Sequence, residues 1–278
     1  MLAPVISPHN RLLSDLEKFA HSNPLSGCVR VQAKQSYTLH ALNIDTALFA
    51  IPLVGTKRIH NQNPPLNVNR GQAILVTKPQ ALDVENLPDR STGMYLAIAI
   101  PLQPNVLEAA RQLIPNRTAT SSSALASISV EPYVDDLNAW LGALVRCDSL
   151  RVHHAIVGLV LRLYEHGFHE LLQPRAPTLA AQVRTMIAME PAKDWSSEEI
   201  EHTLAMSGAT LRRRLAVEGT SLRDVIAEAR LSQAFSLLST TNLPVKTVAL
   251  RVGYSSASTF SRRFSERYGV EPSRLSNE

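Results

Sequence analysis

The fold of the C-terminal third of the chain is decided by residues 244–269, which read PVKTVALRVGYSSASTFSRRFSERYG. Val245, Val248 and Ala249 fall on one side of a helical turn, so they predict the buried side of a short helix. Gly253 follows this helix, and glycine commonly stands just beyond a last helical turn because it adopts positive φ without strain. The segment is therefore predicted to begin with a short helix that ends in a tight turn.

A second helix follows the turn and is predicted to end near Tyr268. Ser255 or Ser256 can cap its N-terminus. Phe260 and Phe264 are four residues apart, so both face inward. The opposite side then carries basic and small polar side chains, namely Ser258, Ser261, Arg262 and Arg263.

Residues 196–218 repeat this layout. A short helix that begins at Ser196 is followed by a break and by a second helix over residues 207–217, which Ser207 can cap. Each residue of a helix is rotated by about 100° from the one before, which sorts the side chains of the second helix by face. Two leucines face inward and three arginines with one alanine lie on the other sides: Leu211 and Leu215, against Ala209, Arg212, Arg213 and Arg214.

The two units are in register, because Arg213 matches Arg262 and Leu211 matches Phe260, each 49 residues apart. Between them, residues 221–239 predict one uninterrupted amphipathic helix that acts as a rigid spacer. Two helices joined by a tight turn form the helix-turn-helix design. One such unit is weak evidence, since exposed arginines on helices are common. Two units in register on a spacer helix are much stronger evidence.

A helix with basic and small polar side chains fits the major groove of B-DNA. Arginine can donate two hydrogen bonds to a guanine there, whereas hydroxyls, neighbouring arginines and helix N-termini can hold phosphates. A single unit reads two successive grooves only as a dimer, but two units on one spacer can do so within one chain. The repeat therefore predicts sequence-specific DNA binding.

Residues 178–278 resemble the DNA-binding domain of the AraC/XylS family of bacterial transcription regulators. Glu201 departs from the alanine usual in that family, and Leu275 stands where an aromatic residue is common; both are packing positions. Residues 218–221 are most similar to the branch that includes activators of type III secretion and virulence genes. The resemblance rests on residues 206–215, 218–221, 229–231, 245–249, 253–254, 260–264, 268–269 and Pro272.

The resemblance implies an all-α domain with two helix-turn-helix units joined by a long helix, which reads successive major grooves with helices 207–217 and 256–268. Carried over by position, the base-reading residues are Ala209, Arg212, Arg213, Ala257, Ser258, Ser261 and Arg262. The two alanines can offer only methyl contacts. The residues expected to hold DNA phosphates are Ser207, Thr210, Arg214, Ser256 and Arg263.

The N-terminal half has a different texture. Residues 1–20 predict a short helix, and residues 27–101 contain short apolar runs separated by turn formers, which predict a small barrel or sandwich. Residues 55–57 and 70–73 resemble cupin-like effector barrels of the same family. The expected fold class is therefore α+β, with a cupin-like barrel and flanking helices before the all-α domain. The apolar runs are 28–31, 37–42, 47–54, 73–76 and 94–100.

Three regions are expected: a β-rich effector-sensing domain over 1–125, a helical dimerisation segment and linker over 126–177, and the DNA-binding domain over 178–278. Helices are expected at 106–114, 132–147 and 150–172, and a loop at 118–127. The family implies a small-molecule or protein effector at the barrel, a homodimer formed through 132–172, and contact with RNA polymerase at a promoter.

Composition and net charge exclude few classes of protein. The net charge is +4, but residues 178–278 hold 13 basic against 11 acidic residues and the remainder 15 against 13, so bulk charge does not single out the C-terminal domain. Cys28 and Cys147 lie too far apart in sequence to predict a disulfide framework or a zinc site. No stretch is long enough for a membrane span and no export signal is expected, which favours the bacterial cytoplasm and association with the nucleoid.

No cofactor, metal or catalytic residue is expected. His166 and His169 lie three apart on a helix, which is more often a surface arrangement than a metal site. His40 and His60 lie in β-rich sequence without the His-x-His pattern of metal cupins. The favoured function is a transcription activator. The alternatives are a repressor of the same fold, and an enzyme whose barrel does chemistry while the helical domain tethers it to DNA.

Overall fold

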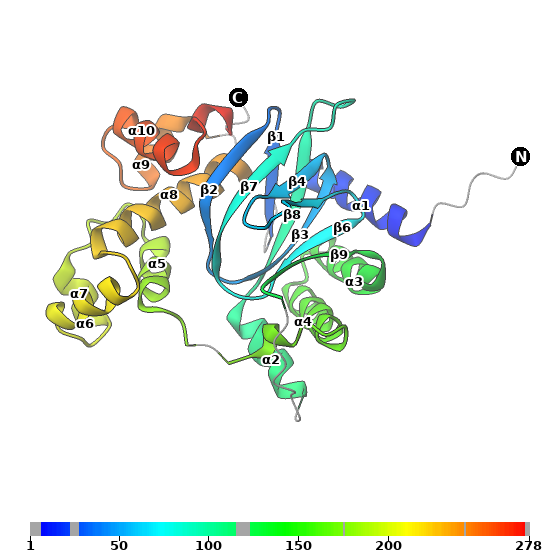
Figure 1. The fold of residues 1–278 in the computed structure, drawn as a ribbon, viewed down its shortest axis with the longest axis horizontal. Coiled ribbons are helices and arrows are strands. Elements are labelled where there is room, and N and C mark those ends of the chain that lie inside the picture. Colours follow the sequence, from blue (N-terminus) through cyan, green and yellow to red (C-terminus); the bar gives the residue numbers. More distant parts are fainter. Residues whose placement is uncertain (1–6, 23–27, 115–122, 175, 242, 276–278) are drawn as a thin grey trace, which may run out of the picture. The chain divides into compact units, whose positions relative to one another are not determined.

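The structure is a computed structural model of the chain, and it describes residues 7–22, 28–114, 123–174, 176–241 and 243–275. The chain folds into two compact units, residues 1–174 and 175–278 (Figure 1). The first combines sheets and helices and the second is all-α, so the α+β fold class is confirmed. No helix in the described ranges is long and apolar enough to cross a membrane.

Two antiparallel sheets form the centre of the first unit. The larger sheet has the strand order β1-β8-β3-β6-β9, and the smaller sheet has the order β2-β7-β4-β5. The strands are β1 (Val29–Ala33), β2 (Tyr37–Ile44), β3 (Ala47–Val54), β4 (Thr56–Ile59), β5 (Leu66–Val68), β6 (Gln72–Val76), β7 (Gln80–Leu87), β8 (Tyr95–Leu102) and β9 (Leu125–Ser129).

The larger sheet is buried on both faces. In β3, Phe49, Ile51 and Leu53 face a core shared with the helices, whereas Ala50 faces a second core between the two sheets. A strand covered on both sides reads as a continuous apolar run, which is why residues 47–54 stand out in the sequence. The helices of this unit are α1 (Pro8–Ser22), α2 (Pro104–Leu113), α3 (Val134–Val145) and α4 (Ser149–Glu165), with 3₁₀ turns at Glu131–Tyr133 and His169–Leu172.

Helices α3 and α4 belong to the same core as the sheet. Trp140 of α3 and Val160 of α4 are buried in one apolar cluster with Phe49 of β3. Figure 1 shows α3 and α4 beside the strands of the larger sheet. The segment expected to be a dimerisation helix pair therefore also contributes to the folding of the first unit.

Two local expectations are wrong. Residues 125–127, expected within a loop, begin β9, and Leu125 pairs with Val76 of β6; residues 118–122 lie outside the described residues. The Ser- and Ala-rich composition favours a loop, but β6 offers an open edge whose backbone groups need partners. The helix expected over 150–172 ends at residue 165, because Gly167 adopts φ +93° and only a 3₁₀ turn follows.

The second unit consists of helices joined by short turns. They are α5 (Leu179–Met189), α6 (Ser197–Thr203), α7 (Gly208–Val217), α8 (Leu222–Thr240), α9 (Val245–Arg251) and α10 (Ala257–Tyr268), followed by a 3₁₀ turn at Pro272–Arg274. Helix α8 runs from the α6–α7 pair at one end to the α9–α10 pair at the other (Figure 1). We call α5–α7 the first head and α9–α10 the second head.

Candidate nucleic-acid interface

The first helix-turn-helix is built from local capping. Ser196 Oγ accepts a hydrogen bond from Glu199 N at 3.1 Å, and Glu199 Oε2 accepts one from Ser196 N at 3.1 Å, which together form a capping box at the start of α6. These contacts and the neighbouring Lys193 lower the pKa of the Glu199 carboxyl. After the turn, Ser207 Oγ accepts from Thr210 N at 3.4 Å and begins α7.

Helix α7 presents one apolar face and one basic face. Leu211 and Leu215 are fully buried, as their four-residue spacing predicts. Ala209 and the three arginines Arg212, Arg213 and Arg214 are all exposed. Within the described part of the chain, none of these arginines has a hydrogen-bond or ion-pair partner. Three unpaired guanidinium groups on one short helix are suited to bind an anionic polymer.

Glu201, which departs from the family pattern, packs against Gly208. A Cβ placed on Gly208 would lie 2.4 Å from Glu201 Oε1, so the larger side chain on α6 is accommodated by the absence of one at the start of α7. Glu201 Oε1 also accepts a hydrogen bond from Ser197 Oγ at 2.6 Å. The departure therefore changes local packing and leaves the exposed face of α7 intact.

The second helix-turn-helix has the same layout with different packing. Gly253 forms the turn with φ +85°. Ser256 Oγ accepts from Thr259 N at 3.3 Å and caps α10. Phe260 and Phe264 are fully buried, with ring centroids 5.5 Å apart. Aromatic side chains thus occupy the inward positions that leucines occupy in α7.

The outward face of α10 is partly engaged. Ser258 and Arg262 are exposed, whereas Ala257, Ser261 and Arg263 are half-buried. Arg262 Nη1 donates to Glu266 Oε1 at 3.0 Å, and these side chains are 65% and 60% exposed. Such an exposed pair is weak and can open when DNA phosphates or bases compete for the guanidinium. The predicted readers of each head therefore lie together on one reading helix.

A hollow of about 470 Å³ lies between the two heads, and the sequence reasoning missed its importance. Arg223 of α8 and Arg263 of α10 both line it, together with Tyr254, whose buried hydroxyl has no hydrogen-bond partner among the described residues. The sequence signal for this hollow is Arg223, a basic residue two positions after Ser221, the N-cap of α8. The charge and position of Arg223 suit a DNA phosphate between two successive grooves.

A buried polar cluster lies inside the first unit. Lys57 Nζ donates to Asn86 Oδ1 at 2.7 Å, Asn86 Nδ2 donates to Tyr37 Oη at 2.9 Å, and Lys57 Nζ lies 5.2 Å from the centroid of the Tyr95 ring. Burial lowers the pKa of Lys57 to about 7. The hydroxyl of Tyr95 is buried and has no partner in the described ranges. Lys57 follows the strand-turn residues of the cupin-like stretch, but its burial was not predictable from them.

The histidines considered as ligands have other contacts. His60 Nε2 lies 3.1 Å from Glu85 Oε2, and His166 Nδ1 lies 3.0 Å from Tyr133 Oη. His40 lies 4.0 Å from Asp83. Among the residues that the structure describes, no three His, Cys, Asp or Glu side chains group as a metal ion would require.

Known proteins and a protein family match the sequence of the second unit. A family described as "Helix-turn-helix domain" matches residues 201–278. An HTH-type transcriptional regulator of Mycobacterium tuberculosis is 41% identical over 98 residues, which are 35% of this chain and 28% of that protein. GadX of Escherichia coli, also an HTH-type transcriptional regulator, is 32% identical over 108 residues, 39% of each chain. The match thus spans less than half of these relatives.

Solved structures share the fold of most of the chain. Apo ToxT from Vibrio cholerae, in a variant form, aligns with a TM-score of 0.67 over 90% of this chain and 97% of that one, at 14% identity. Wild-type ToxT with a bound unsaturated fatty acid aligns with a TM-score of 0.63 over 88% and 92% of the two chains, at 15% identity. At this identity the likeness shows the fold alone. The second unit of this chain, by its sequence matches and its paired capped helices, is a helix-turn-helix DNA-binding domain of the AraC/XylS type.

Proposed function

We propose that this chain is a transcription regulator that binds a promoter with both heads and activates transcription through contact with RNA polymerase. The single observation that carries the proposal is the equivalence of α7 and α10. Both are serine-capped, both bury their inward face, and both present an exposed arginine at the matching position, Arg213 and Arg262. Two such helices on one spacer read two successive major grooves.

The proposed division of labour follows exposure and chemistry. Arg213 and Arg262 donate to guanine edges, and the remaining readers refine the sequence: Ala209, Arg212, Ala257, Ser258 and Ser261. Phosphates are held by Ser207, Thr210, Arg214, Ser256 and Arg263. The capping serines also leave helix N-termini pointed at the DNA, where the partial positive charge favours a phosphate.

The test begins with selection of binding sites from random duplex DNA by the full chain. Arg213→Ala and Arg262→Ala should each lose about 1–3 kcal/mol of discrimination at one base pair. Arg11→Ala, which removes an exposed arginine from α1, is the matched control and should bind as the wild type does. Failure of the wild-type chain to enrich any sequence would refute the proposal. Transcription with purified RNA polymerase then separates activation from repression.

A second proposed activity belongs to the first unit: it receives an effector that carries a carboxylate. Lys57 is the residue on which this proposal rests, because an ammonium group has three donors and, among the described residues, Asn86 accepts a hydrogen bond from it. The hydroxyl of Tyr95, which has no partner in the described part of the chain, lies in the same cluster. An acid would accept a further hydrogen bond from Lys57 and favour its charged form. The bound unsaturated fatty acid in ToxT supports an acid with an apolar tail.

The effector proposal is tested by thermal unfolding with a cis-unsaturated sixteen-carbon acid and with its methyl ester. The acid should raise Tm increasingly as its concentration exceeds its Kd, and the ester should not, because it lacks the anion. Lys57→Met should abolish the shift, whereas Lys78→Met, on the exposed side, should keep it. Equal shifts from acid and ester, or an undiminished shift in Lys57→Met, would contradict the proposal.

Dimerisation through 132–172 is a further part of the proposal. The turn between α3 and α4 exposes Val145 at 63% and Leu150 at 79%, an apolar pair that a partner copy would cover. Leu150→Lys should shift the wild-type dimer to a monomer in sedimentation equilibrium. The family resemblance also underlies two further proposals: a division of labour among three regions with boundaries at residues 125 and 177, and action at the nucleoid in the cytoplasm.

A further inference from the structure

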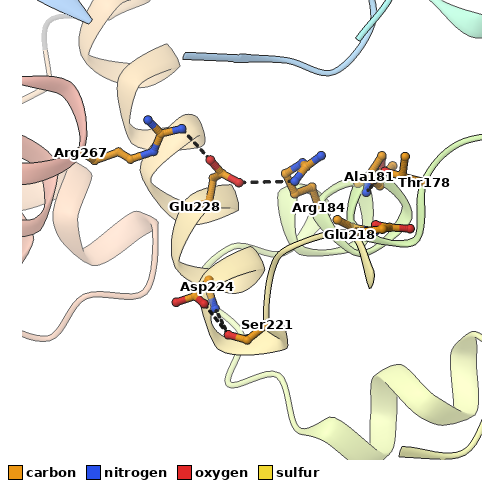
Figure 2. A network of polar contacts seen from close by, with 10 residues as sticks. Thr178, Ala181, Arg184, Glu218, Ser221, Asp224, Glu228 and Arg267 are labelled. Carbon is orange, nitrogen blue, oxygen red and sulfur yellow. Dashed lines mark hydrogen bonds and ion pairs between the residues drawn. The ribbon is translucent and has the colours of Figure 1, made fainter. Parts of the chain in front are cut away.

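One carboxylate in the middle of α8 contacts both heads. Glu228 Oε1 accepts from Arg267 Nη2 of α10 at 2.6 Å, and Glu228 Oε2 lies 3.4 Å from Arg184 Nη1 of α5. Figure 2 shows Glu228 between the two arginines, with one oxygen toward each. The exposed fractions are 21% for Glu228, 21% for Arg267 and 16% for Arg184, so the network is largely shielded from solvent.

The two arginines belong to different heads. Arg184 lies on α5, whose apolar side packs in one core with α7, because Val183 and Leu211 share the same buried cluster. Arg267 lies on α10, the reading helix of the second head, and its guanidinium also lies 5.3 Å from the ring of Tyr268. A change in the angle between the heads would therefore break at least one of the two contacts of Glu228.

Arg230, two residues further along α8, makes a second bridge. Its Nε donates to Pro191 O at 2.9 Å and its Nη2 to Lys193 O at 2.8 Å, both in the segment after α5. Its Nη1 donates to Gly253 O at 3.4 Å, in the turn of the second head. One guanidinium thus joins backbone from both heads.

The heads also approach each other directly at this point. A Cβ on Gly253 would lie 2.8 Å from Pro191 O and 3.0 Å from the guanidinium of Arg230. The turn of the second head is therefore packed against the first head as closely as a glycine allows.

We propose that Glu228 and Arg230 form an inter-head clamp that sets the spacing and rotational phase of the two half-sites that the protein accepts in DNA. Glu228 is a positioning residue, because it lies on α8 and acts through Arg184 and Arg267. The inference rests on the proposed function, namely that both heads read DNA. It adds a determinant of specificity that contacts no base.

The physical reason lies in the geometry of the duplex. One inserted base pair moves the second half-site by about 3.4 Å along the axis and rotates it by about 34°, since a turn holds roughly 10.5 base pairs. Rigidly joined heads cannot follow that rotation without breaking the clamp. Loosely joined heads can follow it at little cost. The loss of DNA affinity caused by one inserted base pair therefore measures how rigidly the clamp joins the two heads.

The experiment compares Glu228→Gln with Glu218→Gln in the full chain. Glu218 is the matched control because it is also a structural carboxylate, but it works within one head: its Oε1 and Oε2 accept from Leu179 N at 2.8 Å and Ala180 N at 2.9 Å. Figure 2 places it beside the start of α5, away from Arg267. Both variants remove a charge, so a loss of stability alone would affect both.

The measured quantity is the ratio of Kd for the selected site with one inserted base pair to Kd for the selected site. The wild type and Glu218→Gln should share a large ratio. Glu228→Gln should lower the ratio about fivefold, within the range of couplings measured in one ion network. An unchanged ratio in Glu228→Gln, with wild-type affinity for the selected site intact, would overturn the clamp and leave the proposed function standing.

A second measurement needs no DNA. Spin labels at Val217→Cys and Leu250→Cys report the distance between the heads; both sites are exposed, at 85% and 55%. Cys147→Ser removes the exposed thiol, whereas burial raises the pKa of Cys28 to about 12 and keeps it unreactive. The wild type and Glu218→Gln should give one narrow distance distribution, and Glu228→Gln a broader one. A narrow distribution in Glu228→Gln would refute the clamp whether or not the chain binds DNA.

Discussion

The two reading helices share a backbone design but differ in what surrounds their arginines. On α7, three consecutive exposed arginines have no partners among the described residues. On α10, Arg262 is paired with Glu266 at 3.0 Å, and Arg267 is engaged by Glu228 at 2.6 Å. An equivalent position in the repeat therefore does not guarantee equivalent electrostatics. We expect α7 to contribute more of the salt-dependent affinity for DNA. On α10, we expect the predicted base-reading side chain of Arg262 to be held in a narrower range of positions by its ion pair.

The cores beneath the two helices differ in the same way. Leu211 and Leu215 hold α7, whereas Phe260, Phe264 and Tyr268 form a row of tilted rings on the buried side of α10, with consecutive centroids 5.5 and 4.8 Å apart. Aromatic side chains bury more surface per residue and add edge-to-face contacts. The second head should therefore depend more strongly on single core residues than the first.

The largest expected effect tests that difference. Phe264→Ala should lower the free energy of unfolding of the second head by about 4 kcal/mol, and Leu215→Ala that of the first head by about 3 kcal/mol, because the larger side chain leaves the larger cavity. Amide hydrogen exchange measured separately over α7 and α10 checks this. Equal losses in the two heads would remove the distinction between their cores.

The next effect concerns the turn of the second head. Gly253→Ala should cost about 3 kcal/mol, because the left-handed conformation at φ +85° disfavours a side chain and the added Cβ meets Pro191 O. Gly219→Ala is the control, since its φ is +73° but no atom lies within 4 Å of the added Cβ. That control should cost about 1 kcal/mol in urea denaturation. A control as damaging as Gly253→Ala would show that backbone strain alone accounts for the effect.

A smaller effect separates reading from phosphate binding within α7. Arg213→Ala should change the preferred base at one position of the selected site. Arg214→Ala should weaken all sequences about equally and reduce the slope of log K against log salt by about one. Binding measured between low and moderate salt on matched and mismatched sites distinguishes them. The assignment of α7 would be reversed if Arg214→Ala altered the base preference.

The smallest effect tests the restraint on Arg262. An exposed i, i+4 ion pair is worth about 0.3–0.5 kcal/mol, so Glu266→Gln should strengthen DNA binding by about twofold through release of the guanidinium. Glu271→Gln, an exposed acid beyond α10, is the control for the change of net charge. Equal gains from both variants would indicate general electrostatics instead of the pair with Arg262.

The sequence predicted the second unit well because its signals are local. The capping serines, the four-residue apolar spacing and the turn glycine each act within one helix or turn, and Ser207, Phe260 and Gly253 occupy the predicted places. The match between two units 49 residues apart strengthened the prediction of each unit. The assignment of individual side chains to bases or phosphates stays a prediction, because exposure alone does not show which DNA atom a side chain contacts.

The first unit was less predictable because its decisive contacts join residues distant in sequence. β9 forms only because the edge of β6 needs a partner, and neither segment shows this by composition. Lys57 belongs to the stretch 55–57 that resembles an effector barrel, and nothing in its neighbouring residues marks it as buried. Its burial depends on Asn86 and Tyr37, which reach it across neighbouring strands of the smaller sheet. Long-range pairing of this kind leaves no periodic signal in one sequence.

By itself, the sequence determined that the second unit contains two capped helix pairs on a spacer helix and which faces those helices expose, because helix periodicity and capping are properties of neighbouring residues. Only the tertiary structure decided how the heads are joined. Glu228 and Arg230 read as an ordinary charged face of α8, and their role appears when α5, α8 and α10 bring Arg184, Pro191 and Arg267 around them. Spatial convergence of distant residues, absent from any local pattern, therefore joins the two heads to each other.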